Sequence, residues 1–215
     1  MNAVAEQTDS LLQRTDPRIV GSLYRLLEIL LETVRPEAFP LWLCEGSFLG
    51  AVRHGGIIPW DDDVDLEFFR EDERRLWGLR EALGRRGCLL TRWWGGYKCF
   101  FADGVPVRGE SHLYPFLDLF PAKRTGKGKI VYARLRARLA WRHIFFHEAE
   151  LFPLVERPFG PLSLPCPARH EGYFRRNYGE DWDSAAYATF DHRTETALRP
   201  RKVRLVDRKA ADYVL

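Results

Sequence analysis

The sequence predicts an α+β domain built on a mixed β-sheet flanked by helices. Hydrophobic residues alternate between a helical and a strand period, and the predicted elements run helix, strand, helix, strand, helix and then strands. The chain has 215 residues, of which 46% are hydrophobic and 29% charged, an ordinary globular composition. This length corresponds to one domain of generous size. An aromatic content of 13% argues against disorder.

The first half of the chain contains four predicted elements. Leucines and a valine within residues 23–34 recur at i, i+3, i+4 and i+7, which predicts an amphipathic helix that ends before Pro36. Residues 41–45 form a short apolar run typical of a buried strand, and residues 47–53 are predicted to form a short helix. Acidic and apolar residues alternate over residues 63–69, which is the period of a strand.

The second half is predicted to begin with a charged surface helix over residues 71–86 and a hairpin over residues 88–101 that turns at its Gly-Gly pair. A strand is expected over residues 112–120, broken by Pro115 and ended by Pro121. The remaining segments are predicted, in order, as a basic loop at 125–129, a helix at 130–147, an extended or hairpin-like segment at 153–169 and a short helix at 171–178.

The domain boundaries follow from these elements. Residues 1–16 are expected to be a flexible N-terminus, residues 17–199 a single domain, and residues 200–215 a C-terminal tail of uncertain structure. The N-terminus lacks a basic region followed by an apolar one, so no secretory signal is expected. No apolar run approaches the ~20 residues of a transmembrane segment.

The cysteine positions and the net charge argue against several classes of protein. The four cysteines lie at 44, 88, 99 and 166 without a CxxC pair, which argues against a zinc ribbon or a disulfide framework. A reducing, cytoplasmic location is therefore expected. The net charge of +3 is too small and too dispersed to indicate nucleic-acid binding, although it suits a site for an anionic small molecule.

Four aspartates lie within five positions, at Asp61, Asp62, Asp63 and Asp65. Such a cluster is often a solvated acidic turn, but this one is bounded on both sides by apolar residues. Asp63 and Asp65 are two apart on a strand, so their carboxylates point to the same face. A divalent cation would remove their mutual repulsion, and a few hard oxygen ligands suit Mg²⁺ or Mn²⁺ better than Ca²⁺.

Gly46 and Ser47 follow the first predicted strand and open a helix. Backbone N–H groups at such a turn, together with the Ser47 hydroxyl, can face an anion, although Gly-Ser pairs also simply make turns. A Gly-Ser pair, a spacer and then Asp-Val-Asp is the signature of the nucleotidyltransferase fold. The mixed β-sheet is therefore expected to be nucleotidyltransferase-like.

The amino-acid sequence of one stretch indicates a particular family within this fold. EGSFLGAVRHGGIIPWDDDVDLEF, residues 45–68, closely resembles the core motif of the LicD family, which includes bacterial phosphocholine transferases and has fukutin and fukutin-related protein as relatives. HLYPFLDLFP, residues 112–121, resembles the family's second acidic strand, and FRRNYGEDW, residues 174–182, its C-terminal helix. Blocks of resemblance cover about residues 20–183.

The resemblance implies a phosphotransferase. Family members move a phosphorylated alcohol from a CDP-linked donor to a hydroxyl of a glycan or glycolipid acceptor, and they release CMP. Asp63, Asp65 and Asp118 would hold the Mg²⁺ or Mn²⁺ ion, and Asp118 could also accept the proton of the acceptor hydroxyl. The alternative for Asp118 is a partly buried carboxylate satisfied by backbone N–H groups. Choline, ribitol and glycerol all remain open as the alcohol.

Other residues have less certain roles. Arg53 and Lys98, with Gly46 and Ser47, are candidates for binding the donor phosphates, but a lone lysine in a hairpin is more often a solvated edge residue. Asp61 and Asp62 could order the ligands, hold a second metal or be solvated. Two alternative functions remain open. The chain could be a nucleotidyltransferase that releases pyrophosphate, or a non-catalytic domain that binds nucleotides or glycans.

Overall fold

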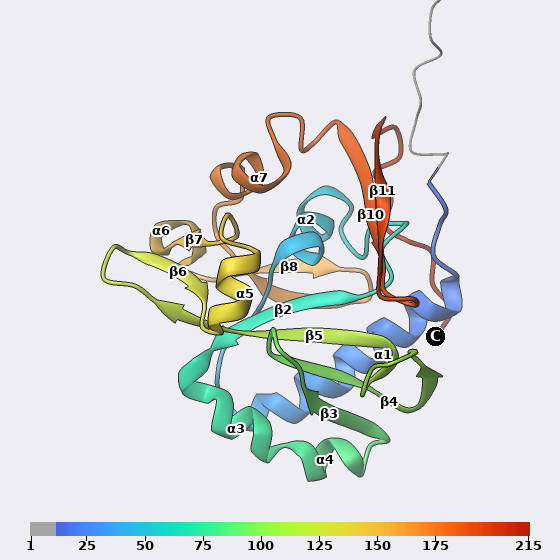
Figure 1. The fold of residues 1–215 in the computed structure, drawn as a ribbon, viewed down its shortest axis with the longest axis vertical. Coiled ribbons are helices and arrows are strands. Elements are labelled where there is room, and N and C mark those ends of the chain that lie inside the picture. The colour runs from blue at the N-terminus through green and yellow to red at the C-terminus, as the bar shows by residue number, and fades with distance from the viewer. Residues whose placement is uncertain (1–11) are drawn as a thin grey trace, which may run out of the picture.

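The computed structural model describes residues 12–215, except for the side chains of residues 188, 189 and 198–201. Residues 1–11 of the predicted flexible N-terminus lie outside the described part. Figure 1 shows a central sheet with helices around it and a separate hairpin near the C-terminus. Over residues 12–215, no helix combines the length and the apolar character that crossing a membrane requires.

The central sheet has seven strands and is mixed, as predicted. Its main path runs β1-β2-β5-β4-β3, with β6 joined to β5 and β7 to β6. β2 and β5 are parallel, and the other neighbours are antiparallel. The strands are β1 (Leu41–Leu43), β2 (Val64–Phe69), β3 (Cys88–Arg92), β4 (Tyr97–Pro106), β5 (Leu113–Arg124), β6 (Lys129–Tyr132) and β7 (Phe146–His147).

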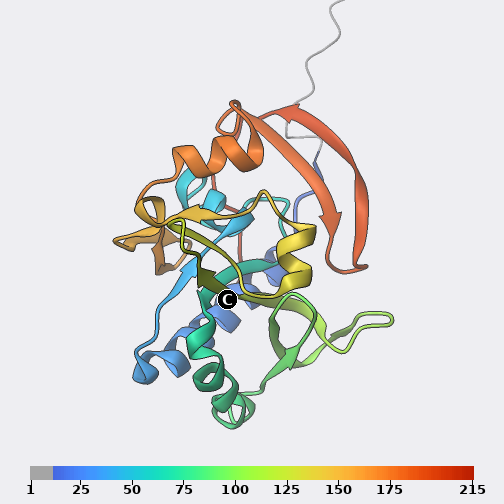
Figure 2. The same ribbon diagram turned by 60° about the vertical axis from the view of Figure 1, so that its left-hand side comes forward.

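Helices and two smaller hairpins surround this sheet. The helices are α1 (Pro17–Val34), η2 (Arg35–Glu37), α2 (Glu45–Arg53), η3 (Arg70–Asp72), α3 (Glu73–Gly78), α4 (Arg80–Gly84), α5 (Leu135–Ala140), α6 (Glu148–Leu151) and α7 (Glu171–Tyr178). The hairpins are formed by β8 (Val155–Phe159) with β9 (Leu162–Cys166), and by β10 (Ala185–Asp191) with β11 (Thr196–Arg204). Figure 2 shows β10 and β11 as a long curved hairpin next to α7.

The long helix α1 supports one face of the sheet. Asp16 caps its N-terminus by accepting the N–H of Arg18 at 2.8 Å, and Pro17 occupies the first turn, where a missing N–H costs nothing. The inner leucines of α1, Leu23 and Leu27 among them, share one buried core with the apolar face of β2 and β5. The predicted amphipathic helix is confirmed.

The side-chain alternation of β2 sets the two faces of the sheet. Val64, Leu66 and Phe68 are fully buried in the core. Asp65 and Glu67 point to the opposite face, because successive strand residues alternate. This confirms the strand predicted over residues 63–69 and leaves a row of acids on the face that α1 does not cover.

The predicted helix over residues 130–147 is wrong. The segment instead forms β6, the short helix α5 and the two-residue strand β7. The arginines and leucines of this segment favour a helix locally. However, β5 is longer than its neighbours, and its end, Ala122–Arg124, pairs with Ile130–Tyr132 of β6. Pairing with this free strand end outweighs the local helix propensity.

The predicted interruption of the strand over residues 112–120 is also wrong, because β5 runs through both prolines. Pro115 lies opposite the register shift between Phe100 and Val105 of β4, where the ladder is interrupted. Pro121 lies between the part of β5 that pairs with β4, which ends at Leu119, and the part that pairs with β6, which begins at Ala122. Both prolines therefore occupy positions at which a missing N–H breaks no hydrogen bond to β4 or β6.

Most of the other predicted elements are confirmed. Residues 88–101 form the β3–β4 hairpin, residues 153–169 contain the β8–β9 hairpin, and residues 171–178 are helix α7. The helix predicted over residues 71–86 is divided into η3, α3 and α4. The division falls after Gly78, which is consistent with the ~1 kcal/mol cost of glycine inside a helix.

Both chain ends, as far as they are described, pack on the domain. Leu12 is buried against Val203 and Leu205, and the Thr15 N–H donates to the Pro59 carbonyl at 2.8 Å. Near the C-terminus, the backbone N–H of Ala211 donates to the carbonyl of Ile57 at 2.8 Å. The predicted tail of uncertain structure thus begins within β11 and then runs along the segment that leads to β2.

Candidate active site

The register of the sheet brings three charged residues into one row. Asp65 of β2 is the cross-strand partner of Asp118 of β5, and Asp118 is the partner of Lys98 of β4. Directly paired residues place their side chains on the same face of a sheet. The two carboxylates predicted from distant parts of the sequence therefore lie side by side.

Asp63, which immediately precedes β2, completes a group of three carboxylates. One oxygen each of Asp63, Asp65 and Asp118 lies within 4.8 Å of the others. Asp118 Oδ2 accepts a hydrogen bond from Lys98 Nζ at 3.0 Å, whereas its buried Oδ1 has no hydrogen-bond partner within residues 12–215. A buried acceptor without a partner is costly, so this oxygen is available to a ligand. The geometry fits the hard, oxygen-rich coordination of Mg²⁺ or Mn²⁺.

Burial raises the pKa values of several acids in this region, and neighbouring carboxylates raise them further. Burial, with the nearby Asp118 and Asp62 charges adding to it and His192 opposing it, raises the pKa of Asp63 to about 6. Burial together with the charge of Asp63 raises the pKa of Asp65 well above its usual value. In the same way, burial and then Asp63 raise the pKa of Asp61 to about 7. A cation would stabilise all of these charged forms.

Helix α2 positions the acidic strand. The N–H of Asp65 donates to the hydroxyl oxygen of Ser47 at 2.8 Å, which ties the strand to the first turn of the helix. A side chain on Gly46 would place its Cβ 3.1 Å from Asp61 Oδ2, so glycine leaves the space that the carboxylates fill. Gly46 lines the cleft described next, and Ser47 supports it from the buried side.

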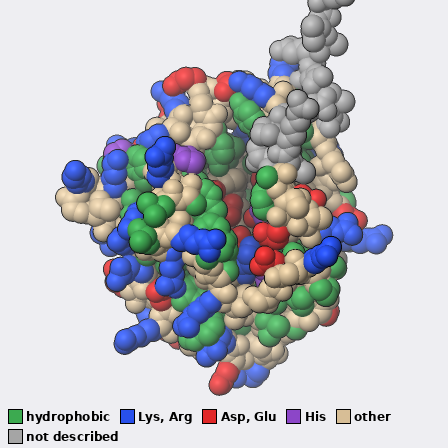
Figure 3. All heavy atoms as spheres, viewed as in Figure 1, with side chains coloured by type: hydrophobic (Ala, Val, Ile, Leu, Met, Phe, Trp, Pro, Cys, Tyr) green, Lys and Arg blue, Asp and Glu red, His purple; other side chains and the backbone are tan. Residues whose placement is uncertain are grey.

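The carboxylates lie in a cleft of about 810 Å³. Figure 3 shows acidic side chains inside a hollow near the middle of this face of the molecule. Of the residues predicted for the site, the cleft is lined by Asp63, Asp65, Asp118, Gly46, Arg53 and Lys98. The sequence therefore identified residues that the fold brings together from α2, β2, β4 and β5.

Lys98 is buried, with 3% of its surface exposed. Its Nζ lies 3.4 Å from the centroid of the Phe116 ring and 4.6 Å from that of Trp93, in addition to its ion pair with Asp118. The alternative reading of Lys98 as a solvated edge residue is therefore wrong. Its predicted contact with a donor phosphate stays a prediction.

Arg53 holds the C-terminal part of the chain. Its Nη1 donates to the carbonyls of Trp182 at 2.7 Å and Ala185 at 3.0 Å, and its Nε donates to His54 Nε2 at 3.0 Å. Because His54 Nε2 accepts this bond, its Nδ1 carries the proton and donates to the Lys209 carbonyl at 3.1 Å. Arg53 and His54 thus connect α2 to the segments on both sides of the β10–β11 hairpin.

This arrangement predicts a structural cost for losing the guanidinium. Arg53→Met should lower the free energy of unfolding by about 3 kcal/mol, because one buried and one part-buried carbonyl lose a charged donor. Thermal unfolding measures the loss, and Arg85→Met, at an exposed position after α4, serves as the matched control. An unchanged melting temperature combined with a raised KM for the donor would instead assign Arg53 to phosphate binding.

The β10–β11 hairpin adds two residues that the sequence did not indicate. His192 Nδ1 lies 2.7 Å from Asp62 Oδ1, and its Nε2 lies 3.1 Å from Asp63 Oδ2. Burial lowers the pKa of His192, but Asp63 and then Asp62 raise it to about 10. Glu195 Oε1 lies 3.8 Å from Lys98 Nζ. No local pattern in residues 185–204 signals these contacts.

Asp62, Asp63 and His192 form a second group able to bind a metal, and Asp63 belongs to both groups. This resolves the uncertain position of Asp62, whose carboxylate faces the cleft. Asp61 also lines the cleft. The aspartate run therefore presents all of its acids to one site instead of to solvent.

Glu45 is a further acid of the cleft that the sequence analysis did not single out. It begins α2 with a φ of 41°, a left-handed conformation that is unfavourable for glutamate. Burial raises the pKa of Glu45 to about 7, and the hydroxyl of Tyr132 donates to its carboxylate. Its position directly before Gly46 in the motif was the available signal.

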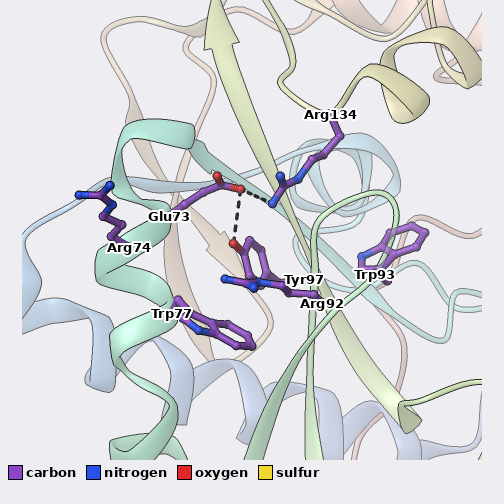
Figure 4. A pocket seen from close by; sticks show the side chains of 7 residues that line it. All are labelled: Glu73, Arg74, Trp77, Arg92, Trp93, Tyr97 and Arg134. Atoms are coloured by element: carbon purple, nitrogen blue, oxygen red, sulfur yellow. Dashed lines mark hydrogen bonds and ion pairs between the residues drawn. The ribbon is translucent and has the colours of Figure 1, made fainter.

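A second cavity of about 540 Å³ lies between α3 and the β3–β4 hairpin (Figure 4). Arg134 Nη2 donates to Glu73 Oε1 at 2.5 Å, and the Tyr97 hydroxyl donates to the same oxygen at 3.4 Å. Arg92 Cζ lies 4.1 Å from the centroid of the Trp77 ring. These contacts join α3, the hairpin and the start of α5.

Comparison with known proteins identifies related chains. A family model described as LicD/FKTN/FKRP, nucleotidyltransferase domain, matches residues 38–169, more than half of the chain. An uncharacterised protein of Rickettsia prowazekii is 30% identical over 171 residues, which cover 80% of this chain and 59% of that protein. Ribitol 5-phosphate transferase FKRP of Homo sapiens is 29% identical over 171 residues, which cover 77% of this chain and 32% of that protein.

Another relative matches a shorter part of the chain at a higher sequence identity. The lipopolysaccharide cholinephosphotransferase LicD of Haemophilus influenzae is 50% identical over 31 residues, which cover 14% of this chain and 12% of that protein. The chain spans less than two thirds of the length of each of these three relatives.

Two solved structures are similar in part. The crystal structure of ANT(2″)-Ia in complex with adenylyl-2″-tobramycin has a TM-score of 0.44 and 18% identity, covering 67% of this chain and 68% of that chain. The lincomycin-bound lincosamide antibiotic adenylyltransferase LnuA has a TM-score of 0.42 and 15% identity, covering 67% of this chain and 79% of that chain.

Proposed function

The chain belongs to the LicD/FKTN/FKRP family, and on this premise we propose that it is a metal-dependent phosphotransferase. It would move phosphocholine, ribitol phosphate or glycerol phosphate from a CDP-linked donor to a glycan hydroxyl and release CMP. The observation that supports this most is the convergence of Asp63, Asp65 and Asp118 within 4.8 Å in a cleft. A bound Mg²⁺ or Mn²⁺ ion would neutralise the charge that develops on the transferred phosphate.

Each acidic residue of the cleft has a proposed role that follows from its position. Asp63, directly before β2, and Asp65, within it, would hold the metal through their carboxylates. Asp118 has one oxygen fixed by Lys98 at 3.0 Å and the other without a partner within residues 12–215. That second oxygen is suited to bind the metal or to accept the proton of the attacking hydroxyl. Lys98 holds the carboxylate in place for either role.

The positive charge of the cleft favours a diphosphate donor. Within the described part of the chain, Arg53 and Lys98 are the lysine and arginine residues that line it. Lys98 is paired with Asp118, and Arg53 donates to backbone carbonyls. A departing pyrophosphate carries several charges and normally requires a cluster of basic residues beside the metal. A nucleoside monophosphate leaving group requires fewer of them.

The experiment that tests this function identifies the leaving group. The protein with Mg²⁺ or Mn²⁺ is expected to form CMP from CDP-choline, CDP-ribitol or CDP-glycerol, and no pyrophosphate from nucleoside triphosphates. Chromatography of the nucleotide products measures both, and Asp63→Asn is the inactive control. Pyrophosphate from a triphosphate, with no CMP from any CDP-alcohol, would establish the alternative nucleotidyltransferase reaction. Ligand-induced stabilisation without turnover of any donor would indicate a binding domain.

A further inference from the structure

The charges of this chain are unevenly distributed. From Leu119 to His147 there are eight lysine and arginine residues and no aspartate or glutamate. The rest of the chain has 25 basic and 30 acidic residues, because the totals are 33 and 30. A basic segment on an otherwise acidic chain predicts an anionic partner for that segment. The eight residues are Lys123, Arg124, Lys127, Lys129, Arg134, Arg136, Arg138 and Arg142.

Helix α5 lies within this basic segment and exposes two leucines. Leu135 is 60% exposed and Leu139 is 68% exposed, and their i, i+4 spacing places both on one side of the helix. The opposite side is anchored, because Ala137 is fully buried. Directly after the helix, the Trp141 ring stacks on Trp94 at 4.8 Å. The leucines therefore project from a firmly held helix.

Arginines without carboxylate partners surround these leucines. Arg136, Arg138 and Arg142 form no ion pair with an acid of residues 12–215, and Arg136 and Arg142 are exposed. Arg134, at the start of the helix, is instead paired with Glu73. Helix α5 thus presents apolar side chains and uncompensated positive charges together.

This surface lies at the edge of the catalytic cleft. Trp94 and Trp141, which hold α5 in place, both line the cleft. Figure 3 shows basic and hydrophobic side chains gathered next to the hollow that contains the acids. A partner bound to α5 would therefore lie beside the cleft entrance.

We propose that α5 docks on an anionic lipid surface. Leu135 and Leu139 enter the boundary between headgroups and acyl chains, and Arg136, Arg138 and Arg142 contact the lipid phosphates. A nucleic acid or a sulfated glycan would pair with the arginines but would leave both leucines in water. A lipid surface accommodates both kinds of side chain. Together with the proposed function, on which this consequence rests, docking would hold the cleft next to the lipid surface.

Vesicle co-sedimentation tests the docking independently of catalysis. The full chain is expected to pellet with vesicles of phosphatidylcholine and phosphatidylglycerol, but not with phosphatidylcholine alone, and to be released by high salt. The double variant Leu135→Asp/Leu139→Asp and the double variant Arg136→Gln/Arg142→Gln should each bind at least ~10-fold more weakly. Circular dichroism verifies that each variant is folded.

Matched control variants test whether the loss of vesicle binding is specific to α5. Leu89→Asp alters a leucine that is 45% exposed on β3, and Arg85→Gln removes an exposed charge after α4. Both should pellet like the unaltered chain. Asp63→Asn should also pellet normally, so an error in the proposed reaction does not affect this measurement.

Three outcomes would overturn the proposal. The first is that the unaltered chain fails to pellet with anionic vesicles. The second is that Leu89→Asp weakens binding as much as the leucine pair on α5 does. The third is that binding to the vesicles depends on Arg136 and Arg142 but not on Leu135 and Leu139, which would identify a general polyanion surface.

Discussion

Asp63→Asn and Asp65→Asn are each expected to abolish metal-dependent turnover while the fold is retained. Each carboxylate lies within 4.8 Å of the other and of Asp118, and a metal held by them would contribute several kcal/mol of charge stabilisation. Turnover should therefore fall by at least ~10³-fold. CMP release from the productive CDP-alcohol, measured over a range of Mg²⁺ concentrations, gives the size of the effect.

The same variants should separate the loss of metal from the loss of structure. Burial and neighbouring carboxylates raise the pKa values of Asp63 and Asp65, so both charges oppose folding at neutral pH when no metal is bound. Without Mg²⁺, each asparagine variant should melt at the same temperature as the unaltered chain or higher. With Mg²⁺, only the unaltered chain and the control Asp103→Asn, at an exposed position in β4, should gain stability. Metal-dependent turnover retained by either variant would contradict this assignment.

Asp118→Asn is expected to reduce turnover by at least ~10²-fold, the lower range for loss of a general base. The amide can still accept a hydrogen bond from Lys98 but can neither accept a proton nor neutralise a metal. The variant also leaves the buried Lys98 ammonium without its 3.0 Å partner charge, so stability should fall as well.

A second substitution distinguishes catalysis from stability at this position. Lys98→Met removes the positive charge but keeps Asp118, so it should also destabilise the protein, by leaving a buried carboxylate unpaired. If Asp118 acts on the substrate, Asp118→Asn should lose far more turnover than Lys98→Met at equal loss of melting temperature. Unchanged turnover in Asp118→Asn, with only the melting temperature reduced, would give Asp118 a structural role only.

The acids of the site could be predicted because they follow a local rule. Strand alternation places Asp63 and Asp65 on one face, and the apolar residues Val64, Leu66 and Phe68 that alternate with the acids identify the strand. Asp118 was instead identified through the resemblance of residues 112–121 to the second acidic strand of the LicD family. The pairing of Asp65 with Asp118 was not predictable from either strand alone, because it depends on the parallel register of β2 and β5.

The parts that sequence reasoning missed depend on contacts between distant segments. His192 belongs to a hairpin whose residues show little periodicity, and it reaches Asp62 across 130 positions of the chain. The helix predicted over residues 130–147 failed because the free end of β5 was not visible in the sequence. In this chain, pairing of residues 130–132 with the end of β5 outweighs their local helix preference.

The position of the β10–β11 hairpin late in the chain has a consequence for biosynthesis. A growing polypeptide leaves the ribosome from its N-terminus, and the segments that emerge first can begin to fold first. Asp62, Asp63 and Asp118 therefore emerge well before His192, the cation that contacts two of them. During that interval Asp62 and Asp63 lack this counter-charge. A divalent cation at the proposed metal site would supply positive charge to these aspartates before the hairpin is in place.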